Sequence, residues 1–181
     1  MKRFIQKISI AVFCAAMAVP AFAQEDALKG LPGYVDFGEL SSVYGEPQVR
    51  ISIGGALLNF VGAMARNEDP EAAAIFSKLK GVRVNVYNTG GDSSAALGVV
   101  SDVKGRLGGN WQPVVQVNEE DEQVQIFMNF EGEIMNGLTV MAVDDEEAVF
   151  INVIGQLDPN ELAELMDNFD VDVGDIDIDF D

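Results

Sequence analysis

The sequence predicts a two-layer α+β domain, in which a mainly antiparallel sheet carries helices on one face. Three observations favour this class. Stretches that alternate apolar and polar residues indicate strands, and stretches with apolar residues three or four apart indicate helices. The expected elements follow the order β-α-β-α-β-β-β-β-α along the chain. Consecutive strands joined by short turns form antiparallel hairpins, and helices can cover one face of such a sheet.

The first half of the domain is expected to alternate strands and helices. A strand is predicted at 49–53, and apolar residues follow at helical spacing over 57–64. Asp69 can cap the free amides of a further helix, and Pro70 suits the first position because a donor there would be unpaired anyway. Gly81 is expected to end this helix in the left-handed cap conformation.

One more strand and one more helix are expected before the pattern changes to strands at Trp111. A strand is predicted at 82–86, and a glycine turn with a serine cap at 90–94 precedes a helix over 96–107. This turn lacks the lysine and the glycine spacing of a phosphate-binding loop. Strands follow from Trp111, and the alternation of apolar and polar residues over 124–130 indicates that one face of the sheet is partly exposed to solvent.

Two acidic turns and a last helix complete the domain. The apolar stretches 138–143 and 148–154 are predicted to form a hairpin around the acidic turn 144–147, and a second acidic turn lies at 119–122. Residues 158–161 supply a cap, a proline and a capping-box acid for the last helix. Its apolar residues are Leu162, Leu165 and Met166.

The N-terminus has the composition of a secretory signal. Three basic residues precede the apolar stretch 8–19, which is too short to span a bilayer as a helix. Small residues then occupy both positions that signal peptidase reads, so cleavage is expected between Ala23 and Gln24. Cys14 is not expected to carry lipid, because the bulky Phe13 precedes it. The sequence therefore predicts a periplasmic or secreted protein and not a lipoprotein.

Removal of this leader changes the chemistry of the chain. The leader holds three of the eleven basic residues and no acidic one, so the net charge moves from −19 to −22. It also holds the single cysteine, and the chain has no histidine. Disulfides, thiol nucleophiles, serine–histidine triads and the usual zinc sites are thereby excluded. A surface this acidic repels nucleic acid and anionic lipid, and it favours cationic partners.

Four regions are expected along the chain. Residues 1–23 form the signal peptide, and 24–46 form an irregular arm that packs Tyr34, Val35 and Phe37 onto the domain. The single α+β domain spans 47–167, and an acidic tail occupies 168–181. Beyond the leader, no apolar run is long enough to cross a membrane.

The tail is the most unusual segment. As a strand it would place carboxylates on one face and apolar side chains on the other. Such a face could contact a cationic partner or calcium, although the spacing does not fit a helix–loop–helix calcium loop. The alternative is a solvated acidic end, because runs of like charge are usually solvated. The candidate contact residues are Asp170, Asp172, Asp175, Asp177, Asp179 and Asp181.

Several segments resemble the DUF4252 family, a bacterial domain of unknown function. The resemblance rests on Gly30–Phe37, the helix start at Asp69–Glu71, and the strand that follows Leu79. It extends through Trp111, Gly137–Val140 and Glu147–Gly155. The resemblance implies an exported protein, and the family brings no known activity or catalytic residues.

The sequence therefore predicts a non-enzymatic binding or regulatory module of the cell envelope, with a protein partner and no cofactor. A basic partner surface would complement the acidic tail. The alternative is a hydrolase that uses carboxylates, alone or with a divalent ion. Paired acids in the turns 119–122 and 144–147 would be its candidates. A catalytic pair needs one carboxyl in an apolar pocket, whereas acids in hairpin turns are commonly exposed.

Export predicts a definite mature mass. Protein recovered from the periplasmic fraction should begin at Gln24, because the small residues at 21 and 23 direct cleavage there. Intact-mass spectrometry measures this directly. A mass that includes Met1, or a lipid-modified Cys14, would contradict the prediction.

Overall fold

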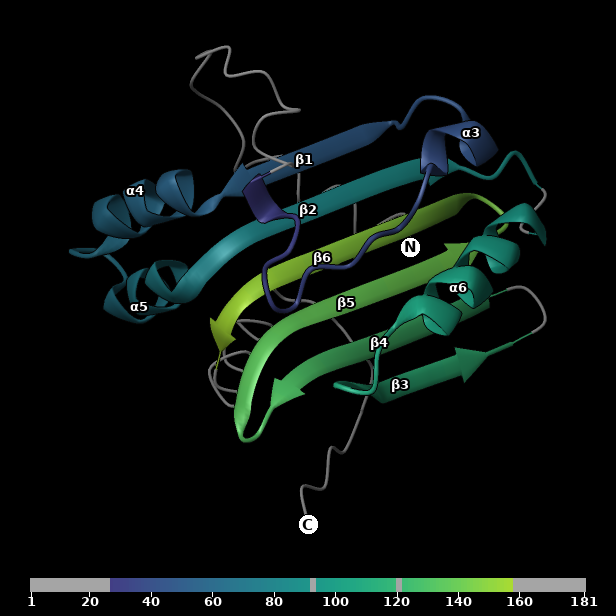
Figure 1. Cartoon of the computed structure of the whole chain (residues 1–181). Coiled ribbons are helices and arrows are strands. Elements are labelled where there is room, and N and C mark those ends of the chain that lie inside the picture. Colours follow the sequence, from purple (N-terminus) through teal and green to yellow (C-terminus); the bar gives the residue numbers. More distant parts are fainter. Residues whose placement is uncertain (1–26, 92–93, 120–121, 158–181) are drawn as a thin grey trace.

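A six-stranded antiparallel sheet forms the body of the protein (Figure 1). The computed structural model describes residues 27–91, 94–119 and 122–157. The strand order is β1-β2-β6-β5-β4-β3, and all five neighbouring pairs are antiparallel. The strands are β1 Val49–Gly54, β2 Leu79–Asn88, β3 Trp111–Asn118, β4 Glu122–Glu131, β5 Ile134–Asp144 and β6 Glu147–Leu157. The helices are α3 Leu40–Tyr44, α4 Gly55–Ala65, α5 Pro70–Lys78 and α6 Ser94–Arg106.

The α+β class predicted from the sequence is confirmed. Strands β3 to β6 form a continuous antiparallel meander, and the hairpin around 144–147 joins β5 to β6 as expected. The predicted last helix lies outside the described residues. Among the helices that the structure describes, none is long and apolar enough to cross a bilayer.

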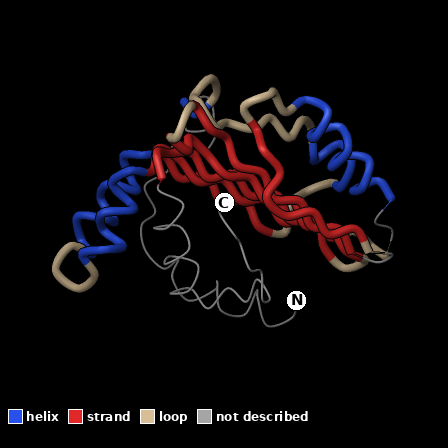
Figure 2. Tube along the Cα trace, turned by 90° about the horizontal axis from the view of Figure 1, so that it is seen from below, coloured by secondary structure: helices blue, strands red, loops and turns tan. Residues whose placement is uncertain are grey.

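One face of the sheet, here called the front face, is covered by α6 and the N-terminal arm 27–47 (Figures 1 and 2). Val35 and Phe37 of the arm are buried in a core with Phe150 of the sheet and Val103 of α6, as the sequence predicted for the arm. The arm also contains the short helix α3, in a segment predicted to be irregular.

The helices α4 and α5 lie beyond one end of the sheet, because they connect the end of β1 to the start of the adjacent β2 (Figure 2). Leu58 and Ile75 of this pair join a second core with Met128 and Leu138, which point to the opposite, back face. The helices are thus not confined to one face. The pair packs closely at Gly62, where a Cβ atom would lie 3.0 Å from Phe76.

The start of α5 follows the sequence prediction, whereas its end does not. Asp69 caps the helix, with Oδ1 accepting a bond from the amide of Ala72 at 2.9 Å. Gly81 is not the helix cap, because the chain enters β2 directly at Leu79. Gly81 instead makes room for Leu28 of the arm, whose side chain would lie 2.5 Å from an added Cβ atom.

The expectation that one face of the sheet is partly exposed to solvent over 124–130 is wrong. Successive side chains of β4 do alternate between the two faces: Gln125 and Phe127 face the front, and Ile126 and Met128 face the back. Gln125 is nevertheless fully buried. Its amide donates to Asn118, and Lys104 of α6 donates to its oxygen at 3.1 Å. The polar residues of this strand therefore face a covered layer.

A buried polar clamp fixes the arm on the sheet. The side chain of Asn152 accepts a bond from the amide of Val35 at 3.0 Å, and it donates to the carbonyl oxygens of Gly33 and Leu138. Arg83 donates to the carbonyl oxygen of Val35 at 2.8 Å. Gly33 has a φ of 83°, and an added Cβ atom would collide with the backbone of β5. The clamp therefore requires a glycine at this point of the arm.

Replacing Asn152 by alanine tests the clamp. The change leaves buried backbone groups without partners, so the free energy of unfolding is expected to fall by about 2–4 kcal/mol. Asn110→Ala is the matched control, because Asn110 is exposed, and it should change stability by less than about 0.5 kcal/mol. Urea unfolding measures both, and equal stability of the two variants would contradict the clamp.

Candidate functional site

The residues singled out in the tail and at the leader lie outside the described residues. This holds for the six aspartates from Asp170 to Asp181 and for the cleavage pair Ala23 and Gln24. Within the described part of the chain, no group of three or more histidine, cysteine, aspartate or glutamate side chains is placed to hold a metal.

The acidic turn 144–147 is built from its own carboxylates. Oδ1 of Asp144 accepts bonds from the amides of Glu146 and Glu147, each at 2.7 Å. Burial raises the pKa of the Glu147 carboxyl, and the neighbouring Asp144 and Glu146 raise it further. Oε2 of Glu147 is buried without a hydrogen-bond partner among the described residues. The other acidic turn is bridged by a backbone bond between Glu119 and Glu122.

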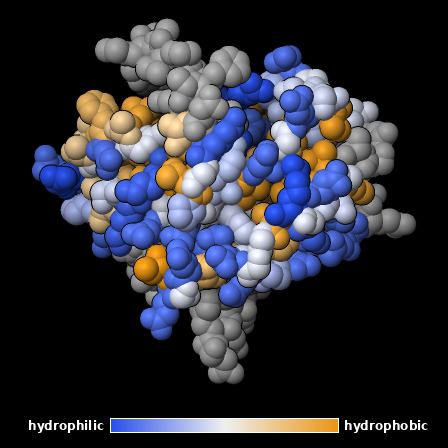
Figure 3. All heavy atoms as spheres, in the orientation of Figure 1, coloured by the Kyte–Doolittle hydropathy of each residue, from blue (hydrophilic) through white to orange (hydrophobic). Residues whose placement is uncertain are grey.

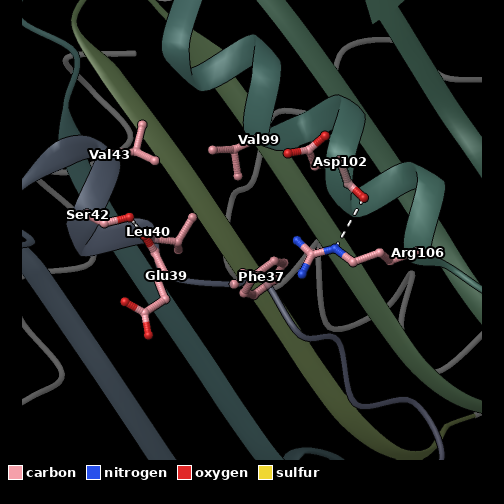
Figure 4. Close-up of a pocket in the computed structure, with 9 residues that line it drawn as sticks. Phe37, Glu39, Leu40, Ser42, Val43, Val99, Asp102 and Arg106 are labelled. Atoms are coloured by element: carbon pink, nitrogen blue, oxygen red, sulfur yellow. Dashed lines mark hydrogen bonds between the residues drawn. The ribbon is translucent and has the colours of Figure 1, made fainter.

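A groove of about 450 Å³ lies between the arm with α3 and the helix α6. Its floor includes Phe37, and Arg106 reaches toward that ring from α6 (Figure 4). Nε of Arg106 donates to the carbonyl oxygen of Asp102 at 3.2 Å. The guanidinium also lies against Gly38, whose φ of 74° keeps the arm close to α6. The remaining lining residues are Glu39, Leu40, Ser42, Val43 and Val99.

The groove has the character of a binding surface more than of a catalytic pocket. Glu39 and Asp102 lie on opposite sides of it, and both side chains are exposed (Figure 4). A general acid at neutral pH is usually a carboxyl held in an apolar pocket. The Arg106 guanidinium beside apolar walls suits an anionic group attached to an apolar body. No local pattern in the sequence predicts this groove, because its residues come from distant segments.

The helix α4 carries the most exposed apolar surface of the described chain (Figure 3). Its side chains Leu57, Phe60, Val61 and Met64 are 43%, 61%, 39% and 67% exposed. These four residues, here called the α4 stripe, lie at positions i, i+3, i+4 and i+7 and so share one side of the helix. The opposite side packs against α5 through Leu58 and Gly62. The sequence showed the helical spacing of 57–64, but not which of its residues are exposed.

Comparison with protein-family models shows the family of the chain. Residues 44–165 match the family described as Domain of unknown function (DUF4252). The match covers most of the chain, and the chain belongs to this family. A comparison with curated proteins gives no match.

The raised pKa of Glu147 has a consequence for stability. Because the folded carboxyl binds a proton more readily than the unfolded one, its stabilising contribution is complete below the unfolded pKa of about 4.3 and is lost as the pH rises through the folded pKa. Glu147→Gln removes this titration, so the free energy of unfolding should decline less between acidic and neutral pH than in the wild type.

Urea unfolding across a pH series measures the difference. Glu131→Gln is the control, because Glu131 is an exposed acid at the end of β4. If the free energy of unfolding of Glu147→Gln changes with pH in the same way as that of the wild type, the burial of Glu147 does not affect stability.

Proposed function

We propose that this member of the DUF4252 family is a non-enzymatic module that binds another protein in the bacterial cell envelope. The observation that carries the proposal is the α4 stripe, which presents four large apolar side chains to solvent. Contiguous exposed apolar surface of this kind marks interaction sites in soluble proteins. The predicted leader supports a location outside the cytoplasm.

The geometry of α4 favours one mode of recognition. The helix is held from one side by α5, so its exposed side is presented on a fixed support. Side chains at i, i+3, i+4 and i+7 are those that a helix inserts into an apolar groove of a partner. None of the residues of α4 is charged. The partner surface is therefore expected to be an apolar groove that accepts a helix.

Charge favours a protein partner over a membrane. Interfacial helices that bind lipid usually carry lysine and arginine on their polar side. The turn after α4 holds one basic residue, Arg66, against two acidic ones, Glu68 and Asp69, and the chain as a whole has a net charge of −19. An acidic surface favours a partner whose groove has basic residues at its rim, where opposite charges speed association.

The hydrolase alternative finds less support. Glu39 and Asp102 are the two carboxylates that line the groove between α3 and α6, and both are exposed. This groove, with the Arg106 guanidinium beside apolar walls, suits binding as well. Hydrolysis of model esters or glycosides that depends on Glu39 or Asp102 would favour the alternative.

A double substitution in the α4 stripe tests the proposal. Phe60→Ser with Met64→Ser removes the two most exposed side chains, so stability should be nearly unchanged while binding weakens at least tenfold, as expected for central apolar contacts. Ile134→Ser is the matched control, because Ile134 is 51% exposed but lies on β5. Partners retained from envelope extracts by the wild type are identified and then titrated against each purified variant.

The proposal fails if the identified partner binds the double variant and the wild type equally. It also fails if the double variant loses affinity for lipid vesicles, because the stripe would then be a membrane contact. Equal weakening by Ile134→Ser would show that the effect is not specific to α4.

A further inference from the structure

The groove between α3 and α6 receives one positive and one negative charge from the same helix. Asp102 and Arg106 are four residues apart on α6, so they share one side of it, with Cβ atoms about 5–6 Å apart. Both residues line the groove, and both are exposed. In Figure 4 the guanidinium reaches toward Phe37, whereas the carboxylate lies near Val99, one turn away on α6. A molecule in the groove would therefore meet both charges.

These two charges do not neutralise each other. Opposite charges four residues apart on a helix often form an ion pair. Here Nε of Arg106 donates to the backbone carbonyl oxygen of Asp102 instead, at 3.2 Å. The two terminal nitrogens lie 3.3 and 3.4 Å from the place that a Cβ atom of Gly38 would take. Among the residues that the structure describes, Arg106 has no carboxylate at ion-pair distance. Its terminal nitrogens are thus available to a ligand as charged donors.

The rest of the groove is mainly apolar. Phe37 and Leu40 are buried beneath it, and Val43 and Val99 border it from α3 and α6. Its volume of about 450 Å³ lies within the range of about 300–1,000 Å³ that is usual for small-molecule sites. The groove therefore suits a small ligand with an apolar body and a charged head.

We infer that this groove binds a free α-amino acid with an apolar side chain. Such a molecule carries a carboxylate and an ammonium group on one carbon atom. The carboxylate would accept bonds from the terminal nitrogens of Arg106, a pairing for which the guanidinium geometry is well suited. The ammonium group would donate to the carboxylate of Asp102. The apolar side chain would then lie on Phe37, between Val43 and Val99.

Charge favours a zwitterion over a ligand of one sign. Asp102 and the net charge of −19 repel a molecule whose only charge is negative, and Arg106 repels one whose only charge is positive. An α-amino acid has no net charge and offers one group to each side chain. Glu39 also lines the groove, but its carboxylate points away from Arg106 (Figure 4). The site is separate from the α4 stripe, so the inference does not rest on the proposed function.

Titration of the protein with L-leucine, followed through its backbone amide signals by NMR, tests the site. Leucine should shift the signals of Gly38 and Val99 until they saturate. Arg106→Gln and Asp102→Asn should each weaken binding at least about tenfold, because each removes one charged contact. Arg66→Gln is the matched control, since Arg66 is an exposed arginine at the end of α4. It should bind leucine like the wild type.

Analogues of leucine test the same contacts without changing the protein. Leucinamide lacks the carboxylate, isocaproate lacks the ammonium group, and glycine lacks the apolar side chain. Each should bind at least about tenfold more weakly than leucine, because each loses one of the three contacts. If isocaproate or leucinamide binds as tightly as leucine, the site does not recognise a zwitterion and the inference is wrong.

Two further outcomes would overturn the inference. One is the absence of a saturable shift at Gly38 and Val99, and the other is equal binding of leucine by Arg106→Gln and the wild type. The double variant Phe60→Ser with Met64→Ser should bind leucine normally. Failure of the groove and failure of the α4 stripe are therefore separate results.

Discussion

The side chain of Asn152 joins the N-terminal arm to the centre of the sheet. It bonds to the backbone of the arm on both sides of Tyr34 and to the backbone of β5. Arg83 reinforces the contact, lying over the rings of Tyr34 and Phe37. Because the arm is held here, Phe37 enters the front core, α3 comes to lie near α6, and the groove between them exists. Buried polar groups that are fully bonded specify one arrangement in this way.

Local signals in the sequence predicted local structure well. The cap at Asp69, the strand at 49–53 and the hairpin around 144–147 all depend on residues close in the chain, and the structure shows each of them. The short helix α3 was missed, because Glu39 provides no side-chain cap and five residues show no periodicity. The groove and the buried role of Gln125 were also missed. Both depend on contacts between distant segments, which a single sequence does not reveal.

The exposed and buried sides of α4 show how its place in the fold shapes its surface. A helix that connected two distant strands would have to cross the sheet and bury its apolar side there. Here β1 and β2 are neighbours, so the connection stays at the end of the sheet. Among the described elements, α4 contacts α5 and the ends of β1 and β2. The stripe of apolar residues is consequently left at a corner of the molecule, where a partner can reach it without displacing any other described element.

The strand order also has a consequence for the timing of folding. The last strand, β6, lies between β2 and β5, so β1 and β2 have no place in the sheet until almost the whole domain has been synthesised. Contacts between segments so far apart in sequence form slowly, because a long loop must close first. Before β6 emerges, the chain can pair β1 with β2 and form the meander from β3 to β5, but these two parts of the sheet cannot join. The six-stranded sheet is thus completed late, and a protein truncated before β6 would leave the β1–β2 pair and the meander unconnected.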